Sequence, residues 1–281
     1  MDVVIVYNPK SGTSISRQEI IKICNINKIK IIEMIAIDDN IKKKLSLHIK
    51  TKRTIIVIGG DGTISSVANI LAGSDSILAP IPGGTLNHFT KDLGIPQDIN
   101  KAFSRLKNAK CRNIDVGIVN NIVFVNNSSF GIYPKSLRVR KDLEASIGKW
   151  PAAFFGVVTA LIHFQIYKVA VDDRILRTPF VFVGNNDYRF DKRGAINRSH
   201  LDSGKLGVAI VRSSSRLHTI WLSTRVITGR AQNLKEFETL LTEDLKINSK
   251  HRYLHVSHDG EVSKISTPLR FQIKKGALRV M

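Results

Sequence analysis

The stretch that decides the fold of the first half of the chain is Ile55-Ile-Val-Ile-Gly-Gly-Asp-Gly-Thr-Ile-Ser-Ser-Val-Ala-Asn-Ile-Leu71. Its short apolar run, residues 55–58, leads directly into glycines, which is typical of a buried strand in a parallel sheet. The residues after the glycines carry apolar side chains at helical spacing, namely Ile64, Val67, Ala68 and Leu71. The stretch therefore predicts a strand, a glycine-rich loop and a helix in direct succession.

The predicted loop, Gly59-Gly60-Asp61-Gly62-Thr63, has the composition of a phosphate-binding loop. Glycines let the backbone N–H groups approach a bulky anion, and the helix N-terminus adds the positive end of a dipole. Asp61 would repel a phosphate unless it holds a metal ion, or a residue that positions one. The alternative is a glycine-rich turn in which Asp61 caps the helix that follows. Strand, glycines, aspartate, threonine and helix together favour phosphate binding.

The segments around this stretch alternate between strand and helix patterns. Strands are expected at residues 3–7, 28–37 and 77–81, with helices at 16–24 and 39–49, the first opened by a capping box of Ser16 and Glu19. Such alternation predicts a parallel sheet with helices on its faces. The run 77–81 ends in a second glycine loop, Pro82-Gly83-Gly84-Thr85-Leu86-Asn87-His88-Phe89. Both glycine loops then lie at the carboxyl ends of strands, where open α/β sheets bind ligands.

Two polar residues of the second glycine loop have two interpretations. Thr85 and Asn87 could donate hydrogen bonds to a phosphate or ribose, or they could cap a helix, since both residue types suit either role. There is no G-x-x-x-x-G-K-[ST] motif, which excludes a Walker-type loop, and no G-x-G-x-x-G follows the first strand. The two loops indicate one nucleotide site of a different kind.

From about residue 112 the pattern changes to short strand-like runs, which predicts a mostly antiparallel second domain. A tight hairpin is expected at Asn120-Asn121. The further runs are residues 167–171, 179–183, 206–211, 253–256 and 269–274, with helices expected at 143–164, 217–222 and 236–245.

Near the end of the chain stands His258-Asp259-Gly260-Glu261, between two strand-like runs. Two carboxylates across a glycine are typical of a tight hairpin turn, where they could simply be solvated. Alternatively, one of them accepts a proton from an attacking hydroxyl, as phosphoryl transfer requires. The residues alone leave both interpretations open.

The composition of the chain indicates that it has an anionic binding partner. The chain has 281 residues, 43% of them hydrophobic, and a formal charge of +20. This charge points to nucleic acid, an anionic lipid surface or a phosphate-rich substrate. Because no stripe of alternating aromatic and basic residues stands out, nucleic acid is the weaker explanation.

The cysteines and the apolar segments predict a cytoplasmic protein. Cys24 and Cys111 have no paired spacing for zinc or a redox motif, so reduced thiols are the simplest interpretation. No signal peptide is expected, because Asp2 stands where basic residues would be. The most apolar segment, residues 150–164, is shorter than the roughly 20 residues that span a bilayer. It is either part of the core or a surface that contacts lipid.

Four motifs in order resemble the diacylglycerol kinase catalytic-domain family, which also contains sphingosine kinases and soluble bacterial lipid kinases. They are Gly59-Gly-Asp-Gly-Thr63, the second loop with Asp92-Leu-Gly-Ile-Pro96, Asn126-Asn-Ser-Ser-Phe-Gly131 and Asp259-Gly-Glu261. The first motif is shared with NAD kinases and 6-phosphofructokinases, whereas the combination is specific. The resemblance covers essentially the whole chain.

The resemblance implies a fold and a reaction. The fold would be an α/β ATP-binding domain of the NAD kinase and diacylglycerol kinase kind, residues 1–115 completed by 276–281, and a β-sandwich lipid-substrate domain, 116–275. ATP with Mg²⁺ would be bound between them, and its γ-phosphate transferred to a lipid hydroxyl, most simply that of diacylglycerol. Glu261 would be the general base, supported by Asp259. The nucleotide-binding residues would be Asn8, Lys10, Ser11, Gly12, Gly59, Gly60, Asp61, Gly62, Thr63, Gly84, Thr85 and Asn87.

The chain departs from the family in two places. After the second glycine loop the family usually has Asn-Asp or Asn-Glu, whereas here His88 follows Asn87. Some bacterial members bind a structural Mg²⁺ through an Asp-Gly-x-Leu motif, where this chain has Ser203 and carries Asp202 one position earlier. A hydroxyl is a poor ligand for a hard cation, so Asp61 and Asp202 are the metal-ligand candidates.

The expected partner is a lipid substrate at the anionic inner face of the membrane, with no nucleic acid, and the resemblance also leaves a homodimer open. Two other functions compete with the lipid kinase. One is an NAD kinase-like enzyme, which shares the first motif. The other is a non-catalytic protein that binds nucleotide or lipid.

Overall fold

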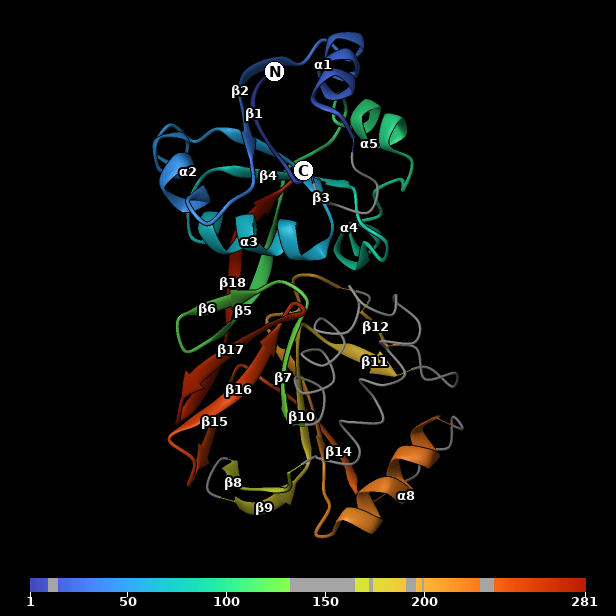
Figure 1. Cartoon of the computed structure of the whole chain (residues 1–281), viewed down its shortest axis with the longest axis vertical. Coiled ribbons are helices and arrows are strands. Elements are labelled where there is room, and N and C mark those ends of the chain that lie inside the picture. The colour runs from blue at the N-terminus through green and yellow to red at the C-terminus, as the bar shows by residue number, and fades with distance from the viewer. Residues whose placement is uncertain (10–14, 132–164, 172–173, 191–195, 199, 228–234) are drawn as a thin grey trace. The chain divides into compact units, whose positions relative to one another are not determined.

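The fold was analysed in a computed structural model of the chain, which describes residues 1–9, 15–131, 165–171, 174–190, 196–198, 200–227 and 235–281 (Figure 1). The chain divides into two compact units. Unit 1 contains residues 1–116, 123–125 and 274–281, and unit 2 contains residues 117–122 and 126–273.

Unit 1 is built on parallel strands. Its strands are β1 (Asp2–Tyr7), β2 (Lys30–Ala36), β3 (Thr54–Gly59) and β4 (Ile77–Pro82). Its helices are α1 (Arg17–Ile26), α2 (Ile41–Lys50), α3 (Asp61–Leu71), α4 (His88–Asp92) and α5 (Ile99–Arg105). The strands pair in the order β2-β1-β3-β4, all parallel. The last residues of β18 (Leu269–Val280) add a further parallel neighbour to β4, where Arg279 pairs with Ile77.

The helices of unit 1 cover both faces of its sheet. Contacts join α2 to α3 and α1 to α5, and the two pairs lie on opposite sides of the strands in Figure 1. The central strands are therefore buried on both faces, as the run Ile55, Ile56, Val57 illustrates with no exposed surface. The capping box is confirmed, since Ser16 Oγ accepts the N–H of Glu19 and the Glu19 carboxylate accepts the N–H of Ser16.

Unit 2 consists mainly of antiparallel strands. Its first sheet has the order β14-β13-β10-β7-β16-β17, formed by β7 (Asn127–Gly131), β10 (Phe180–Asn185), β13 (Leu206–Val211), β14 (Phe237–Thr242), β16 (Tyr253–His258) and β17 (Glu261–Ser266). The first half of β18 pairs with β15 (Asp244–Ser249), followed by β8 (Tyr167–Val171) and β9 (Arg174–Thr178). A small hairpin joins β11 (Tyr188–Phe190) to β12 (Ile196–Arg198), and α8 spans Arg216–Ile227.

The predicted fold class, a parallel α/β unit followed by an antiparallel β unit, is confirmed. The hairpin at Asn120-Asn121 is also confirmed, because it joins β5 (Arg112–Val119) to β6 (Ile122–Phe124). The helix expected at residues 236–245 is wrong, since β14 and β15 occupy this segment. Its Glu and Leu residues favour a helix locally, but β14 forms a continuous antiparallel ladder with β13.

The expected helix 143–164, with its apolar segment 150–164, lies entirely outside the described residues. None of the helices in the described ranges is long and apolar enough to cross a membrane.

The two cysteines differ sharply in exposure, which gives a first prediction. Cys24 is fully buried on α1, and burial raises the pKa of its thiol to about 11, whereas Cys111 is exposed. The thiolate is the reactive form of a cysteine. A disulfide reagent at neutral pH should therefore label Cys111 of the folded protein quickly, and Cys24 only after unfolding. In the Cys111→Ser variant the fast phase should disappear. A fast phase that survives in this variant would contradict the burial of Cys24.

Candidate functional site

The carboxyl ends of β1 and β3 bring two of the predicted loops together in unit 1. The N–H of Asn8 donates to the carbonyl of Ile58 at 3.2 Å, which extends the pairing of these strands by one residue. The side-chain amide of Asn8 then donates to Thr63 Oγ1, also at 3.2 Å. Asn8 and Thr63, 55 positions apart in the sequence, therefore belong to one polar cluster. Lys10, Ser11 and Gly12 lie outside the described residues.

The two glycine loops pack against each other so closely that side chains would not fit. The N–H of Gly83 donates to the carbonyl of Gly59 at 2.9 Å. A Cβ atom added to Gly84 would lie 2.5 Å from the Cα atom of Gly60, and one added to Gly59 would lie 2.6 Å from Cβ of Thr63. Glycine is required at Gly84 because backbone approaches backbone there, and at Gly59 because the Thr63 side chain fills the adjacent space.

Asp61 makes contacts that neither interpretation of the sequence anticipated. The N-cap residue of α3 is Gly60, so Asp61 does not cap its own helix. Its two carboxylate oxygens instead accept the backbone N–H groups of His88 at 3.1 Å and Phe89 at 3.0 Å, the first residues of α4. The carboxylate thus satisfies two N–H groups that have no partner within α4. Its metal role is not tested by these contacts and stays a prediction.

Asn87 closes the second glycine loop. Its backbone is left-handed, with φ of 52°, and its side chain accepts the N–H of Gly84 and donates to the carbonyl of Gly84, both at 2.9 Å. It is the N-cap residue of α4 by position, but its side chain makes no capping hydrogen bond. Thr85 is exposed beside it. Asn87 therefore shapes the loop, while Thr85 remains accessible to a ligand.

A cavity of about 720 Å³ adjoins this loop within unit 1. Its walls come from α1, from the second glycine loop and from the start of α5, with Glu19, Ile23, Gly84, Asn87 and Asn100 among its lining residues. This volume is within the range of pockets that hold small-molecule ligands.

In unit 2 the predicted hairpin turn is confirmed. His258 pairs with Glu261, and the two residues between them have φ of 47° at Asp259 and 87° at Gly260, as in a type I′ turn. Asp259 is buried, and its Oδ1 accepts the backbone N–H groups of Asn126 at 2.7 Å and Asn127 at 3.0 Å. Glu261 is exposed at the start of β17. The two carboxylates therefore have different environments, one buried and bonded to backbone, the other open to solvent.

A buried arginine close to this turn was not predicted from the sequence. Arg198 is 8% exposed, donates to Asn126 Oδ1 and to the carbonyl of Asn185, each at 3.1 Å, and lies over the ring of Tyr188. The Tyr188 hydroxyl donates to the carbonyl of Asn126 at 3.1 Å. Arg198 and Tyr188 thus hold the residue whose N–H binds Asp259. The motif that begins with Asn126 and Asn127 indicated that this segment matters for the site. Nothing in the sequence linked Arg198 to these asparagines.

The segment around Ser203, where a structural metal was considered, contains a hydrogen-bonded arrangement. Both the N–H and the hydroxyl of Ser203 donate to Asn186 Oδ1 at 2.8 Å, and Asn186 is fully buried with φ of 74°. Asp202 is exposed next to it. Within the described ranges no group of three metal-ligating side chains comes together. Ser203 and Asn186 thus link their two segments, and the metal role of Asp202 stays a prediction.

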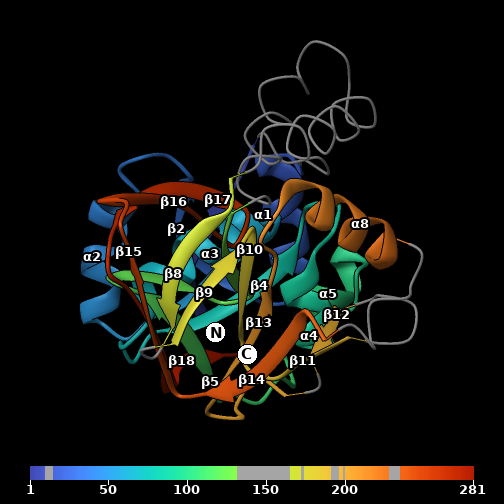
Figure 2. The same cartoon turned by 90° about the horizontal axis from the view of Figure 1, so that it is seen from below.

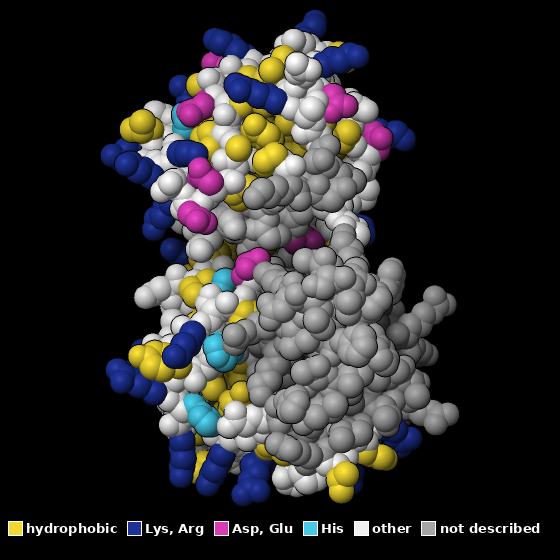
Figure 3. Space-filling view, viewed as in Figure 1, with side chains coloured by type: hydrophobic (Ala, Val, Ile, Leu, Met, Phe, Trp, Pro, Cys, Tyr) yellow, Lys and Arg dark blue, Asp and Glu magenta, His cyan; other side chains and the backbone are white. Residues whose placement is uncertain are grey.

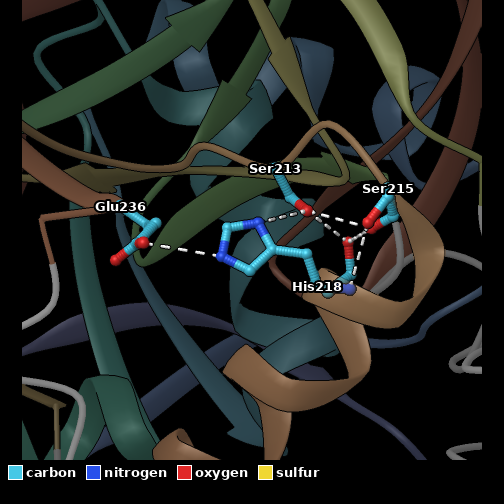
Figure 4. A network of polar contacts seen from close by, with 5 residues as sticks. Ser213, Ser215, His218 and Glu236 are labelled. Atoms are coloured by element: carbon cyan, nitrogen blue, oxygen red, sulfur yellow. Dashed lines mark hydrogen bonds and ion pairs between the residues drawn. The ribbon is translucent and has the colours of Figure 1, made fainter.

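A further polar network in unit 2 has the residue types of a catalytic triad but not its accessibility (Figure 4). His218 Nδ1 lies 3.4 Å from Ser213 Oγ, and His218 Nε2 lies 3.5 Å from the Glu236 carboxylate. Ser213 is 4% exposed, and its hydroxyl donates to the carbonyl of Ser215 and accepts from Thr219. Because Ser215 Oγ accepts the N–H of His218 in the first turn of α8, the network caps this helix.

The buried contacts of Asp259 predict a stability effect. Asp259→Ala leaves the N–H groups of Asn126 and Asn127 without this acceptor and puts alanine at a left-handed φ, so unit 2 should lose about 2–4 kcal/mol of unfolding free energy. Asp259→Asn keeps an acceptor oxygen and a residue that tolerates this φ, so its loss should be clearly smaller. Urea denaturation measures both variants. Equal stability of Asp259→Ala and the parent protein would refute the role of Asp259 in holding the turn.

The contacts of Ser203 predict the response to metal removal. Since the hydrogen bonds to Asn186 link the two segments, a chelator added to the nucleotide-free protein should leave Tm unchanged. Ser203→Ala, which removes the hydroxyl, should lower Tm slightly with or without the chelator. A drop in Tm with the chelator in the parent protein would instead establish a structural metal, with Asp202 as its first candidate ligand.

Two family matches cover most of the chain. Residues 2–119 match the diacylglycerol kinase catalytic domain, and residues 149–281 match the YegS C-terminal NAD kinase beta sandwich-like domain. Two crystal structures from Bacillus anthracis str. Sterne share the fold over 99% of this chain and 96% of theirs. One has a TM-score of 0.77 at 23% identity. The other, a diacylglycerol kinase, has a TM-score of 0.69 at 21% identity.

Curated relatives agree with these matches. A diacylglycerol kinase of Bacillus subtilis (strain 168) is 35% identical over 217 residues, which cover 74% of this chain and 70% of the relative. A diacylglycerol kinase of Staphylococcus aureus (strain JH9) is 27% identical over 280 residues, covering 92% of this chain and 85% of the relative. With the motif loops placed as described and a relative of this identity and coverage, the chain belongs to the diacylglycerol kinase catalytic-domain family.

Proposed function

We propose that the protein is an ATP-dependent lipid kinase, which transfers the γ-phosphate of ATP to the hydroxyl of diacylglycerol or a related lipid. The observation that carries this proposal is the pair of interlocked glycine loops at the carboxyl ends of β3 and β4. Their close approach at Gly60 and Gly84 places the N-terminus of α3 beside the second loop, an arrangement suited to a phosphate chain. The names of the curated relatives supply the lipid acceptor.

In this proposal unit 1 binds the nucleotide. The loop residues Gly59 to Thr63 bind the phosphates, with Asn8 oriented by its hydrogen bond to Thr63. The cavity beside Gly84 and Asn87 has room for the nucleoside. Mg²⁺ would add positive charge at the transferred phosphate. Asp61 is its candidate ligand, since each carboxylate oxygen keeps a lone pair beyond the N–H that it accepts.

The general base of the proposed reaction is Glu261 in unit 2. As the lipid oxygen attacks the γ-phosphorus, its proton passes to the Glu261 carboxylate, and the bond from the γ-phosphorus to the bridging oxygen breaks to release ADP. Glu261 suits this role because it is exposed and starts a strand whose turn is held by buried Asp259. Asp259, engaged by two backbone N–H groups, has a positioning role.

The direct test is transfer of labelled γ-phosphate from ATP with Mg²⁺ to lipids in anionic mixed micelles. The panel contains diacylglycerol, monoacylglycerol, ceramide, a sphingoid base and phosphatidylglycerol, with NAD alongside. Label on a lipid is expected and identifies the acceptor. Label on NAD would replace the lipid kinase by an NAD kinase-like enzyme. ATP binding without transfer to any acceptor would favour a non-catalytic binding protein.

The variant Glu261→Gln tests the general-base role of Glu261 separately from nucleotide binding. Removing the proton acceptor should lower the transfer rate by at least about 100-fold, because general base catalysis contributes on this scale. Nucleotide affinity, measured by calorimetry, should stay close to that of the parent protein, since Glu261 is not part of unit 1. An undiminished rate in Glu261→Gln would exclude Glu261 from the chemistry.

A further inference from the structure

The second sheet of unit 2 has one buried face and one strongly basic face. Along β8 and β15 the alternate residues Val169, Val171, Leu245 and Ile247 are buried. The residues between them point the other way, as expected for strands. The exposed side of the sheet carries Lys168 on β8, Arg177 on β9, Lys246 on β15 and Arg270 on β18, and these four residues are termed the basic sheet face.

The strand register places these cations directly opposite each other. Lys168 pairs with Arg177 across β8 and β9, and Lys246 pairs with Arg270 across β15 and β18. Directly opposed side chains have Cβ atoms about 5 Å apart, and like charges at such positions destabilise a sheet. Cross-strand pairing by itself therefore does not favour these pairs.

The same face also carries an exposed apolar residue. Ile175 on β9 is 68% exposed and lies opposite Ala170 of β8. Asp244 is the acidic residue of this face, two positions before Lys246 on β15. Seen from below, β8 and β9 lie open to the viewer (Figure 2), and Lys and Arg side chains gather along the lower end of unit 2 (Figure 3). The surface combines excess positive charge with an accessible apolar contact.

These properties fit an anionic lipid surface better than a nucleic acid. Basic side chains bind anionic headgroups, and an exposed aliphatic side chain such as Ile175 gains by leaving water. Proteins that bind single-stranded nucleic acid usually add aromatic side chains on which bases stack. On the exposed side of the described β8, β9, β15 and β18 residues, none of the alternating side chains is aromatic.

We propose that the basic sheet face binds the surface of a membrane that contains anionic lipids. The choice of a membrane as partner rests on the proposed function, because a lipid kinase must meet its acceptor at such a surface. Anionic headgroups that lie against the opposed cation pairs would reduce the repulsion within each pair.

The test compares two charge-reversed variants of equal net charge. In the first, Lys168→Glu and Arg270→Glu are combined, so that each new carboxylate faces a remaining cation. In the matched control, Lys42→Glu and Lys43→Glu are combined on exposed positions of α2 in unit 1. Binding is measured by co-sedimentation with vesicles of phosphatidylcholine, with and without phosphatidylglycerol, in the absence of ATP. Because this measurement requires neither ATP nor phosphate transfer, its result can be interpreted even if the protein is not a lipid kinase.

The sheet-face variant should bind the phosphatidylglycerol vesicles at least about 30-fold more weakly, since each basic residue near such a surface adds on the order of a factor of five. The control should bind like the parent protein. The Tm of the sheet-face variant should rise, because opposite charges replace like charges across the strands. With a short-chain acceptor dispersed in water, its transfer rate should match that of the parent.

Three outcomes would overturn the proposal. The first is parent protein that does not prefer the phosphatidylglycerol vesicles. The second is equal loss of binding in the sheet-face variant and the control, which would show an effect of net charge alone. The third is vesicle binding that both variants retain while only the sheet-face variant loses binding to a single-stranded RNA, which would assign the face to nucleic acid.

Discussion

The carboxylate of Asp61 is the interaction on which the arrangement of unit 1 depends. It stands in the first turn of α3 and accepts two consecutive N–H groups of α4, so the loop after β3 is fastened to the loop after β4. Hydrogen bonds to a charged acceptor are roughly twice as strong as neutral ones. With this fastening in place, Gly84 can approach Gly60 without a gap between the loops. The negative charge next to an expected phosphate site is thereby explained, because the N–H groups of α4 partly neutralise it.

Unit 2 uses the same device. Asp259 also accepts two consecutive backbone N–H groups, here from Asn126 and Asn127, and so fastens the turn after β16 to the start of β7. In both units an aspartate followed by glycine joins two motifs that are far apart in the sequence. The exposed Glu261 has a different environment, which separates the residue proposed to react from those that hold the backbone. Arg198 and Tyr188 stabilise this link, because both donate hydrogen bonds to Asn126.

The sequence predicted those features that short-range physical rules determine. Short apolar runs before glycines located β3 and β4, the spacing of Ser16 and Glu19 located the start of α1, and Asp259-Gly260 located a tight hairpin turn. It failed where tertiary pairing decides. Residues 236–245 have the local composition of a helix but pair with β13 and β18 as strands. The partners of Asp61 and the position of Arg198 could not be predicted either, because each joins segments that only the folded chain brings together.

The pairing of β18 with β4 has a consequence for synthesis of the chain. The strands β1 to β4 can associate as soon as they leave the ribosome, but the neighbour that pairs with β4 on its other side is made only after all of unit 2. Until then β4 presents unpaired backbone groups at a sheet edge, a known template for association with other chains. The nascent chain therefore carries this open strand edge through the synthesis of all of unit 2, and the arrival of β18 covers it.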